Sequence, residues 1–139
     1  MRITHEADYA IRVTYCLAEH GGKLGAREIS EETGVSLRFA LKILRKLIGC
    51  GIVRSYKGAA GGYELAKPAG EITIGELIEC IDGVIAINHC LCNEFDCTRV
   101  PQKSECAIRH AFGRVNTMIR NELYAIPLDQ FCTPTQATI

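Results

Sequence analysis

The sequence has no long apolar run, although 47% of its 139 residues are hydrophobic. A membrane-spanning helix needs about 20 consecutive apolar residues, and no stretch approaches that length. The first ten residues, MRITHEADYA, also lack the apolar segment of a secretory signal peptide. We therefore expect one globular domain with an appended segment, located in the cytoplasm and without a membrane partner.

Sequence signatures of nucleotide-binding and redox enzymes are missing too. The chain has no G-x-x-x-x-G-K-[ST] loop, no C-x-x-C that opens a helix after a strand, and no ferredoxin-type C-x-x-C-x-x-C run. No arrangement of Ser, His and Asp indicates a hydrolase. We predict that the chain is neither an enzyme nor an electron carrier and that it has no small-molecule substrate.

The net charge is zero, but the two halves of the chain carry opposite charge. Residues 1–70 hold 11 Lys and Arg against 7 Asp and Glu, whereas residues 71–139 hold 5 against 9. Between Arg38 and Lys57 there are six basic residues and no acidic one. Such a basic stretch is typical of a surface that contacts phosphates, although a solvated helix face has the same composition.

Helical patterns and their stop signals surround this basic stretch. Residues 7–20 have apolar positions at helical spacing and end at a glycine pair, and a second helix is expected from Ala26 to Thr33, closed by Gly34. A third helix follows with Ser36 as its N-cap. Two helices joined by a tight glycine turn predict a helix-turn-helix.

The third helix has two faces of different character. The leucine-rich stripe is expected to pack inward; it consists of Leu37, Leu41, Leu44 and Ile48. Arg38, Lys42 and Arg45 share another face, which predicts contact with the major groove of double-stranded DNA. The spacing leaves open whether Phe39 lies in the core or on the DNA side.

After this helix the runs IVRSY and GYELA flank KGAAGG, which predicts a β-hairpin with a glycine-rich tip. The order of helices and hairpin is that of a winged helix-turn-helix, whose wing contacts sugar-phosphate or the minor groove. The predicted DNA contacts are Arg27, Ser36, Arg38, Phe39, Lys42, Arg45, Tyr56, Lys57, Gly58, Gly61 and Gly62.

Two further helices are expected in the acidic half. The first follows Thr73, with Glu76 completing a capping box. The second is expected to open with a serine cap, runs from about Ser104 to Tyr124, and carries a narrow apolar seam made of Ile108, Phe112, Val115, Ile119 and Leu123. Such a seam favours pairing with a second copy over packing on the chain's own domain. Residues after Pro127 are expected to form a poorly ordered tail.

Four of the eight cysteines lie within residues 89–106, HCLCNEFDCTRVPQKSEC. Because cytoplasmic thiols stay reduced, this cluster indicates metal binding or redox sensing rather than a disulfide framework. Thiolates bind iron-sulfur clusters, zinc or copper(I), and the spacings Cys92-x4-Cys97 and Cys106-x3-His110 are close to those of structural zinc. Zinc and an iron-sulfur cluster both remain open on spacing. The other cysteines are Cys16, Cys50 and Cys80, expected as small buried apolar residues, and Cys132, expected to have no role.

Nearly the whole chain resembles the Rrf-type family of bacterial transcription regulators, which has IscR-type, NsrR-type and CymR-type branches. The resemblance runs through MRITHEADYAIR, GAREISEETGVSLRFALKILRKL, GIVRSYKGAAGGYELAKP and ITIGELIECIDG to the long last helix. It implies a homodimer that binds a palindromic operator. In several branches it also implies an iron-sulfur cluster on a three-cysteine loop before the dimerisation helix.

Carried over residue by residue, the resemblance implies Cys90, Cys97 and Cys106 as cluster ligands. They are separated by six and eight residues, a longer spacing than in the IscR-type branch, so the cluster is either 2Fe-2S or 4Fe-4S. The fourth ligand is open between Asp8, Cys92 and His110. Zinc is the less favoured occupant.

These inferences combine into one expected architecture, mainly α with a small β-hairpin wing. Residues 1–83 form a winged helix-turn-helix DNA-binding domain, residues 84–104 a cysteine-rich cluster-binding loop, and residues 105–139 a dimerisation helix and C-terminal tail. The expected function is a repressor that senses iron-sulfur status, nitric oxide, oxygen or redox state. The alternative is a regulator of the same family without a cluster, controlled by thiol oxidation, zinc or a protein partner.

Overall fold

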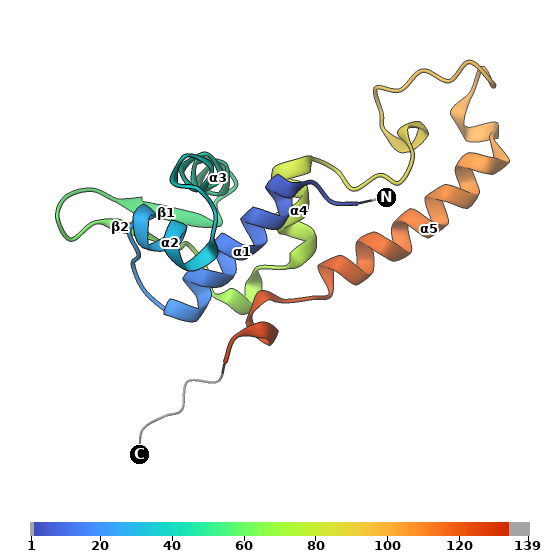
Figure 1. Ribbon diagram of the computed structural model, residues 1–139. Helices are drawn as coiled ribbons and strands as arrows, with labels where there is room; N and C mark the ends of the chain where they lie inside the picture. The colour runs from blue at the N-terminus through green and yellow to red at the C-terminus, as the bar shows by residue number, and fades with distance from the viewer. Residues whose placement is uncertain (1, 134–139) are drawn as a thin grey trace.

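The computed structural model describes residues 2–133 and has the predicted fold class, mainly helical with a two-stranded hairpin (Figure 1). The helices are α1 (His5–His20), α2 (Ala26–Thr33), α3 (Leu37–Gly49), α4 (Ile74–Asp82) and α5 (Ala107–Tyr124), and the strands are β1 (Val53–Tyr56) and β2 (Gly62–Leu65). No helix within the described residues is both long and apolar enough to cross a membrane.

Local signals set the ends of the first three helices as predicted. Gly21 and Gly34 end α1 and α2 in the left-handed conformation, with φ of 73° and 71°. The Ser36 hydroxyl accepts a hydrogen bond from the backbone N–H of Phe39 at 3.3 Å and caps α3. Capping of orphan N–H groups stabilises a helix by about 1 kcal/mol, so α2 and α3 are joined by a well-defined turn.

The predicted inward face of α3 is wrong for three of its four residues. The buried face is Ala40, Ile43, Leu44 and Leu47. Leu37 and Leu41 are half-buried and Ile48 is 36% exposed, so only Leu44 was assigned correctly. The two apolar stripes are neighbours on the helix and share Leu44. The contacts of α3 with α1, α2, α4 and β1 bury the stripe that contains Ala40 and Leu47, and not the predicted one.

The wing is an antiparallel hairpin in which Val53 pairs with Leu65. Leu24, between α1 and α2, extends the hairpin, because its N–H and carbonyl bond the carbonyl and N–H of Tyr63 at 2.9 and 2.8 Å. Gly62 has a φ of 150°, and a Cβ there would lie 2.8 Å from the carbonyl oxygen of Leu24. Glycine is therefore required where the wing meets this segment.

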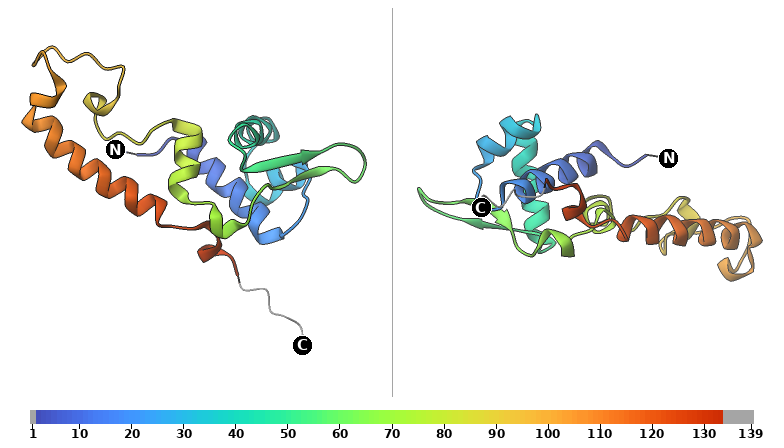
Figure 2. Two further views of the ribbon diagram at one scale, coloured as in Figure 1. Left: turned by 180° about the vertical axis from the view of Figure 1, so that it is seen from behind. Right: turned by 90° about the horizontal axis from the view of Figure 1, so that it is seen from below.

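Helix α5 leaves the winged domain at an angle and extends well beyond it (Figures 1 and 2). It begins at Ala107, with the sulfur of Cys106 as its cap, so the predicted serine cap at Ser104 is wrong. Residues Lys103–Glu105 form a short 3-10 turn instead, which delays the start of the α-helix by three residues.

The chain after α5 returns to the core, and the prediction of a poorly ordered tail after Pro127 is wrong for residues 128–133. Leu128 is fully buried, and its N–H donates to the carbonyl of Ile72 at 2.8 Å. The N–H of Ile74 donates to the carbonyl of Ile126 at 3.0 Å. Burial of one leucine, together with these backbone bonds, is enough to anchor the segment. The rest of the predicted tail, residues 134–139, lies outside the described residues.

Glu79 of α4 holds the winged domain to α5. Its carboxylate accepts hydrogen bonds from Nε and Nη2 of Arg120 at 2.7 and 2.9 Å, from the hydroxyl of Tyr124, and from the N–H of Ile85 at 3.2 Å. The ring of Tyr124 lies against Gly75, where a Cβ would overlap it. The contact is specific, since a bidentate arginine and a glycine are both needed.

This arrangement predicts an acid-sensitive junction. The hydrogen bonds from Arg120 lower the pKa of Glu79 to about 2; burial opposes this shift and the Tyr124 hydroxyl reinforces it. A carboxyl group with a lowered pKa stabilises the fold above its unfolded pKa of about 4.3, and this stabilisation is lost as the pH falls towards 2. We expect Glu79→Gln to lower the free energy of unfolding by about 1 to 3 kcal/mol at pH 7, and by progressively less below pH 4.

Urea unfolding of both proteins between pH 7 and pH 2.5 measures this difference. Glu71→Gln, at an exposed position, is the matched control and should change stability little at any pH. If Glu79→Gln lowered the free energy of unfolding equally at every pH, the stabilisation would not depend on the ionised Glu79 carboxylate.

The cysteines outside the loop do not behave alike. Cys16 is buried as predicted, and burial, reinforced by the Glu32 carboxylate, raises its pKa to about 12. Cys50 and Cys80 were predicted as separate buried apolar residues, and this is wrong, because they form a disulfide between the end of α3 and α4. Their separation of 30 residues hid the pairing in the sequence.

Candidate nucleic-acid interface and cysteine loop

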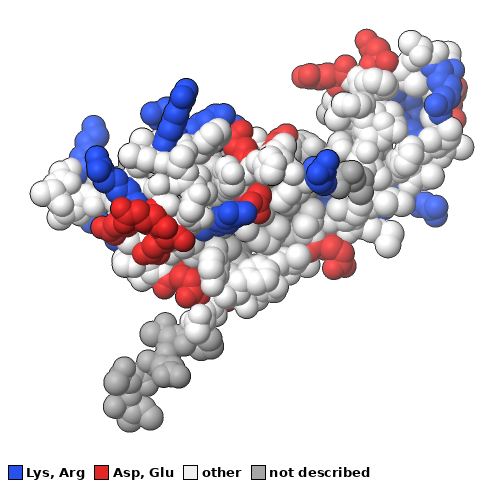
Figure 3. All heavy atoms as spheres, viewed as in Figure 1, with Lys and Arg blue, Asp and Glu red and all other residues white. Residues whose placement is uncertain are grey.

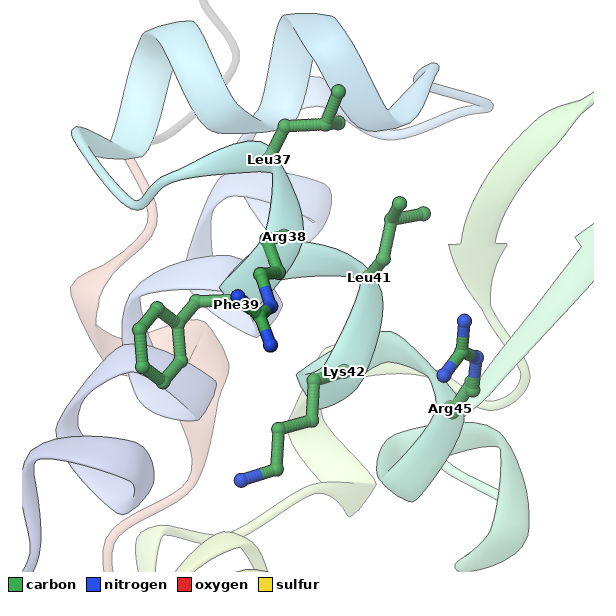
Figure 4. Close-up of a pocket in the computed structure, with 6 residues that line it drawn as sticks. All are labelled: Leu37, Arg38, Phe39, Leu41, Lys42 and Arg45. Carbon is green, nitrogen blue, oxygen red and sulfur yellow. The ribbon is translucent and has the colours of Figure 1, made fainter.

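The exposed face of α3 carries Arg38, Lys42 and Arg45, on the side of the helix away from its buried stripe. Figure 4 shows these side chains projecting into the open space beside α3, and together with Leu37, Phe39 and Leu41 they line a hollow. In Figure 3, basic side chains gather over α3 and the wing. The predicted basic face therefore exists as a surface.

An acidic residue contacts one edge of this surface. Glu6, near the start of α1, has one carboxylate oxygen 3.3 Å from Nζ of Lys42 and 2.8 Å from Nζ of Lys46. The hydrogen bond from Lys46 is the main reason that the pKa of Glu6 is lowered. Within residues 2–133, neither Arg38 nor Arg45 takes part in an ion pair. Two of the cations on α3 are thus partly neutralised and two are available to phosphates.

Replacing Glu6 by Gln should free both lysines for DNA. Each additional phosphate contact steepens the fall of log affinity with log salt by about 0.9. We expect the slope for the Glu6→Gln protein to be steeper by about 1 to 2, with tighter binding of unrelated sequences. Affinities measured between 50 and 200 mM salt test this, with the exposed Glu122→Gln on α5 as control. A slope equal to that of the unmodified chain would show that Glu6 does not compete with phosphate.

Phe39 lies outside the core, with 46% of its surface exposed, which settles the alternative left open by its spacing. Its ring meets Tyr9 of α1 edge-on, with centroids 6.2 Å apart. Arg27 is exposed at the start of α2, whereas the hydroxyl of Ser36 is occupied by its capping bond. Phe39 and Arg27 are therefore both exposed and could contact DNA from either side of the turn between α2 and α3.

The wing presents Tyr56 in a fixed orientation. Its hydroxyl donates to Oε1 of Glu64 at 2.6 Å, and Nζ of Lys23 lies 3.8 Å from the centre of its ring. Arg54 also contacts this Glu64 oxygen, at 3.2 Å. Lys57 and the tip glycine that follows it are exposed. The wing thus offers cationic and backbone groups next to α3.

The two ends of the cysteine loop are tied together by Arg109. Its Nε donates to the carbonyl of Cys90 at 2.9 Å, and its backbone N–H donates to the sulfur of Cys106 at 3.5 Å. Asn116 fixes the entry to the loop, since its side chain bonds the N–H of Ile87 and the carbonyl of Ile85, both at 2.9 Å. These contacts position the first and last cysteines beside the start of α5.

The middle of the loop is more open. The Cys97 sulfur accepts a hydrogen bond from the N–H of Arg99 at 3.4 Å, and this bond, followed by one from Val100, lowers the pKa of Cys97. Cys92 is exposed. A thiol with a lowered pKa is readily deprotonated, and the resulting thiolate is the form that binds metals.

The structure does not bring the predicted metal ligands together at one point. In the described part of the chain, no three His, Cys, Asp or Glu side chains converge on a point where a metal ion would sit. Asp8 pairs with Arg12 at 2.8 Å, and Nε2 of His110 lies 2.7 Å from the carbonyl oxygen of Ser104. The donor chemistry, four thiols on one loop with its ends tied, fits a soft metal centre that would order the loop on binding.

Sequence reasoning missed Arg109, Asn116 and Glu79, which connect the loop to α4 and α5. A basic residue three positions after the last loop cysteine was a usable signal for the first of them. The other two are ordinary polar residues on helix surfaces and carry no local signature.

The profile of the Rrf2 family, described as iron-dependent transcriptional regulators, matches residues 3–134. The chain belongs to this family. Its Rrf2 relatives are transcription regulators, so this chain is a DNA-binding regulator and not an enzyme.

Individual relatives are moderately similar to this Rrf2 chain. Protein aau3 of Rhizobium meliloti (strain 1021) is 34% identical over 116 residues, which cover 82% of this chain and 73% of that protein. The transcriptional regulator IscR of Cronobacter sakazakii is 34% identical over 92 residues, covering 65% of this chain and 57% of that protein. The structure of CymR, named as the global cysteine regulator of B. subtilis, matches with a TM-score of 0.74 and 21% identity over 93% of this chain and 94% of that one.

Proposed function

We propose that the chain is a cytoplasmic, homodimeric repressor that places α3 in the major groove of a palindromic operator and its wing on the flanking backbone. The observation that carries the proposal is the position of Arg38 and Arg45, exposed and without ion pairs among the described residues, on the side of α3 opposite its buried stripe. Arginine binds guanine and phosphate through a planar fork, so such a face suits DNA. Lys57 and Gly58 would contact sugar-phosphate from the wing.

Exposed apolar residues on α5 support the homodimer. Ile108, Phe112 and Val115 are 49%, 38% and 45% exposed, and α5 buries none of its residues completely. An apolar stripe of this length is rarely left in water and usually marks a protein interface. A twofold mate would cover it and present two copies of α3 to two half-sites.

For the sensor, we propose that Cys90, Cys97 and Cys106 hold an iron-sulfur cluster, with Asp8, Cys92 or His110 as fourth ligand. When bound, the cluster would supply a centre that reacts with oxygen or nitric oxide. The relationship to IscR and the four-thiol loop support this assignment. Arg109 and Asn116 would hold the loop ends to α5, and Glu79 would pass a displacement of α5 to α4.

The test of the DNA-binding proposal is a gel shift on the DNA upstream of the chain's own gene. We expect retardation of this DNA at lower protein concentration than of a scrambled duplex of equal length. Equal retardation of both duplexes, or none, would remove the operator proposal and leave only the fold-level relationship.

The cluster proposal predicts a coloured protein. After anaerobic purification, we expect visible absorption and bound iron and sulfide, and we expect Cys97→Ala and Cys106→Ala to lose all three. Cys132→Ala is the matched control and should retain them. Loss of the absorption in Cys92→Ala would make Cys92 the fourth ligand, whereas its retention would leave Asp8 and His110.

A colourless protein with one zinc ion per chain would replace the cluster with zinc on the same loop. A normal cluster in both the Cys97→Ala and Cys106→Ala variants would show that the ligand assignment is wrong.

A further inference from the structure

The disulfide between Cys50 and Cys80 lies outside both the DNA-contacting face and the cysteine loop. Cys50 follows the last residue of α3 as its C-cap, and Cys80 lies in the second half of α4. Their Cα atoms are 6.1 Å apart, which is within the normal range for a disulfide. The bond therefore joins the end of the DNA-reading helix directly to α4, and the wing lies within the segment that it closes.

The bond is open to exchange from solvent. Cys50 is exposed, and Cys80 is half-buried, packed against the core, with its sulfur 3.6 Å from the carbonyl oxygen of Lys46. A thiol or disulfide reagent can thus reach the Cys50 sulfur, while Cys80 stays in place as its partner. A fully enclosed structural disulfide would not offer this access.

The setting favours a bond that forms and breaks. The remaining six described cysteines are free thiols, and transcription regulators work in a compartment where thiols are kept reduced. Disulfides that do occur there are usually transient and redox-sensing. The neighbour of Cys80 is Glu79, which holds α5 through Arg120. The same turn of α4 therefore contacts both the DNA-reading helix and the helix next to the cysteine loop.

We propose that Cys50 and Cys80 form a reversible redox site that responds to low-molecular-weight disulfides and sets how firmly α3 is held for DNA. The Cys50 thiolate attacks one sulfur of the disulfide reagent and releases one thiol. The Cys80 thiolate then attacks the Cys50 sulfur and releases the second thiol. Two protein thiols lose two electrons and two protons, and the reagent gains them as two thiols. A dithiol reverses the reaction.

The oxidised form fixes the end of α3 against α4 before DNA is bound. Fixing a binding element in its bound orientation improves affinity, because less ordering remains for the binding step. Reduction leaves the two helices joined by side-chain packing alone. We therefore expect reduction to weaken operator binding by about 5- to 150-fold, the usual range of coupling between two sites. This part of the inference rests on the proposed operator binding.

The bond itself is tested by peptide mapping of the full chain after treatment with oxidised glutathione. Cleavage after Lys and Arg and before Asp places Cys50 alone in residues 47–54 and Cys80 alone in residues 58–81. A linked pair of these peptides, released by a dithiol, is expected. Its absence after oxidation would overturn the site.

The coupling is tested with metal-free protein and the DNA upstream of its own gene. Oxidised chain should bind at least fivefold more tightly than reduced chain. Cys50→Ser and Cys80→Ser should bind equally in both conditions, with the affinity of the reduced chain, and the control Cys132→Ser should respond like the unmodified protein. Circular dichroism confirms that each variant is folded.

A redox response that persists in both serine variants would assign it to other thiols and overturn the proposal. Tight binding that is equal in both redox states would overturn the coupling while leaving operator binding intact. Absence of retardation in either state would instead remove the operator proposal and, with it, the coupling.

Discussion

Replacing Val115 by Asp is expected to convert the proposed homodimer into folded monomers. Val115 lies in the middle of the apolar stripe of α5 and is 45% exposed in the single chain, so the change leaves the chain's own core intact. In a dimer the carboxylate would be buried without a partner, at a cost on the order of 3 to 5 kcal/mol. The dissociation constant should rise by roughly two to four orders of magnitude. Sedimentation velocity at micromolar concentration measures the change.

The matched control is Thr117→Asp, which adds the same charge at an exposed position on the opposite side of α5. It should remain dimeric. Ile119 is less informative than Val115, because it also lines a hollow with Ile78 and Val84 of its own chain, and a charge there would disturb the monomer. A dimeric Val115→Asp protein would exclude the α5 stripe as the interface.

The double substitution Arg38→Ala with Arg45→Ala should nearly abolish operator binding. Each arginine is expected to contribute about 1 to 3 kcal/mol to the free energy of operator binding. Loss of a contact with a base edge would change the sequence preference, whereas loss of a phosphate contact would weaken binding to all sequences alike. Together they should weaken binding by at least about 30-fold, measured as the shift in the retardation midpoint at fixed salt. Lys42→Ala should weaken binding less, because this lysine already pairs with Glu6.

Arg114→Ala removes the same charge from an exposed position on α5 and is the control. It should leave operator affinity within about twofold. If the double variant of α3 bound as tightly as this control, α3 would not be the helix that enters the groove.

Features that depend on neighbouring residues could be predicted from the sequence. Gly34 and Ser36 define the turn between α2 and α3, and Thr73 caps α4, because each signal acts within three or four residues. The wing could be predicted from the same kind of local signal, because the glycines of KGAAGG tolerate backbone conformations that other residues avoid.

Features that depend on distant contacts could not be predicted. Two apolar stripes on α3 satisfy helical spacing equally, and only packing against α1 and α4 makes Ala40 and Leu47 the buried ones. Leu128 looked like part of a tail, because its partner Ile72 is far away in the sequence. Glu79 looked like a surface residue, yet Arg120, 41 positions later, holds it in place.

The candidate site shows the same division. The basic face of α3 could be predicted, because residues on one helix have a fixed relative orientation. The ion pairs that Lys42 and Lys46 make with Glu6 could not, since α1 meets α3 only in the folded chain. The disulfide was hidden for the same reason.

The anchoring of α5 at both ends gives this helix a mechanical property. Its last turn is fixed to α4 by Glu79, and its first turn is fixed to the cysteine loop by Arg109. With 18 residues and a rise of 1.5 Å per residue, it is a rigid lever about 27 Å long. A displacement of about 2 Å at the cysteine end corresponds to a tilt of only about 4° at the Glu79 end over that length. A change at the loop therefore reaches α4 only as a small rotation of the helix. The contact between Glu79 and α5 must be stiff for this rotation to move α4.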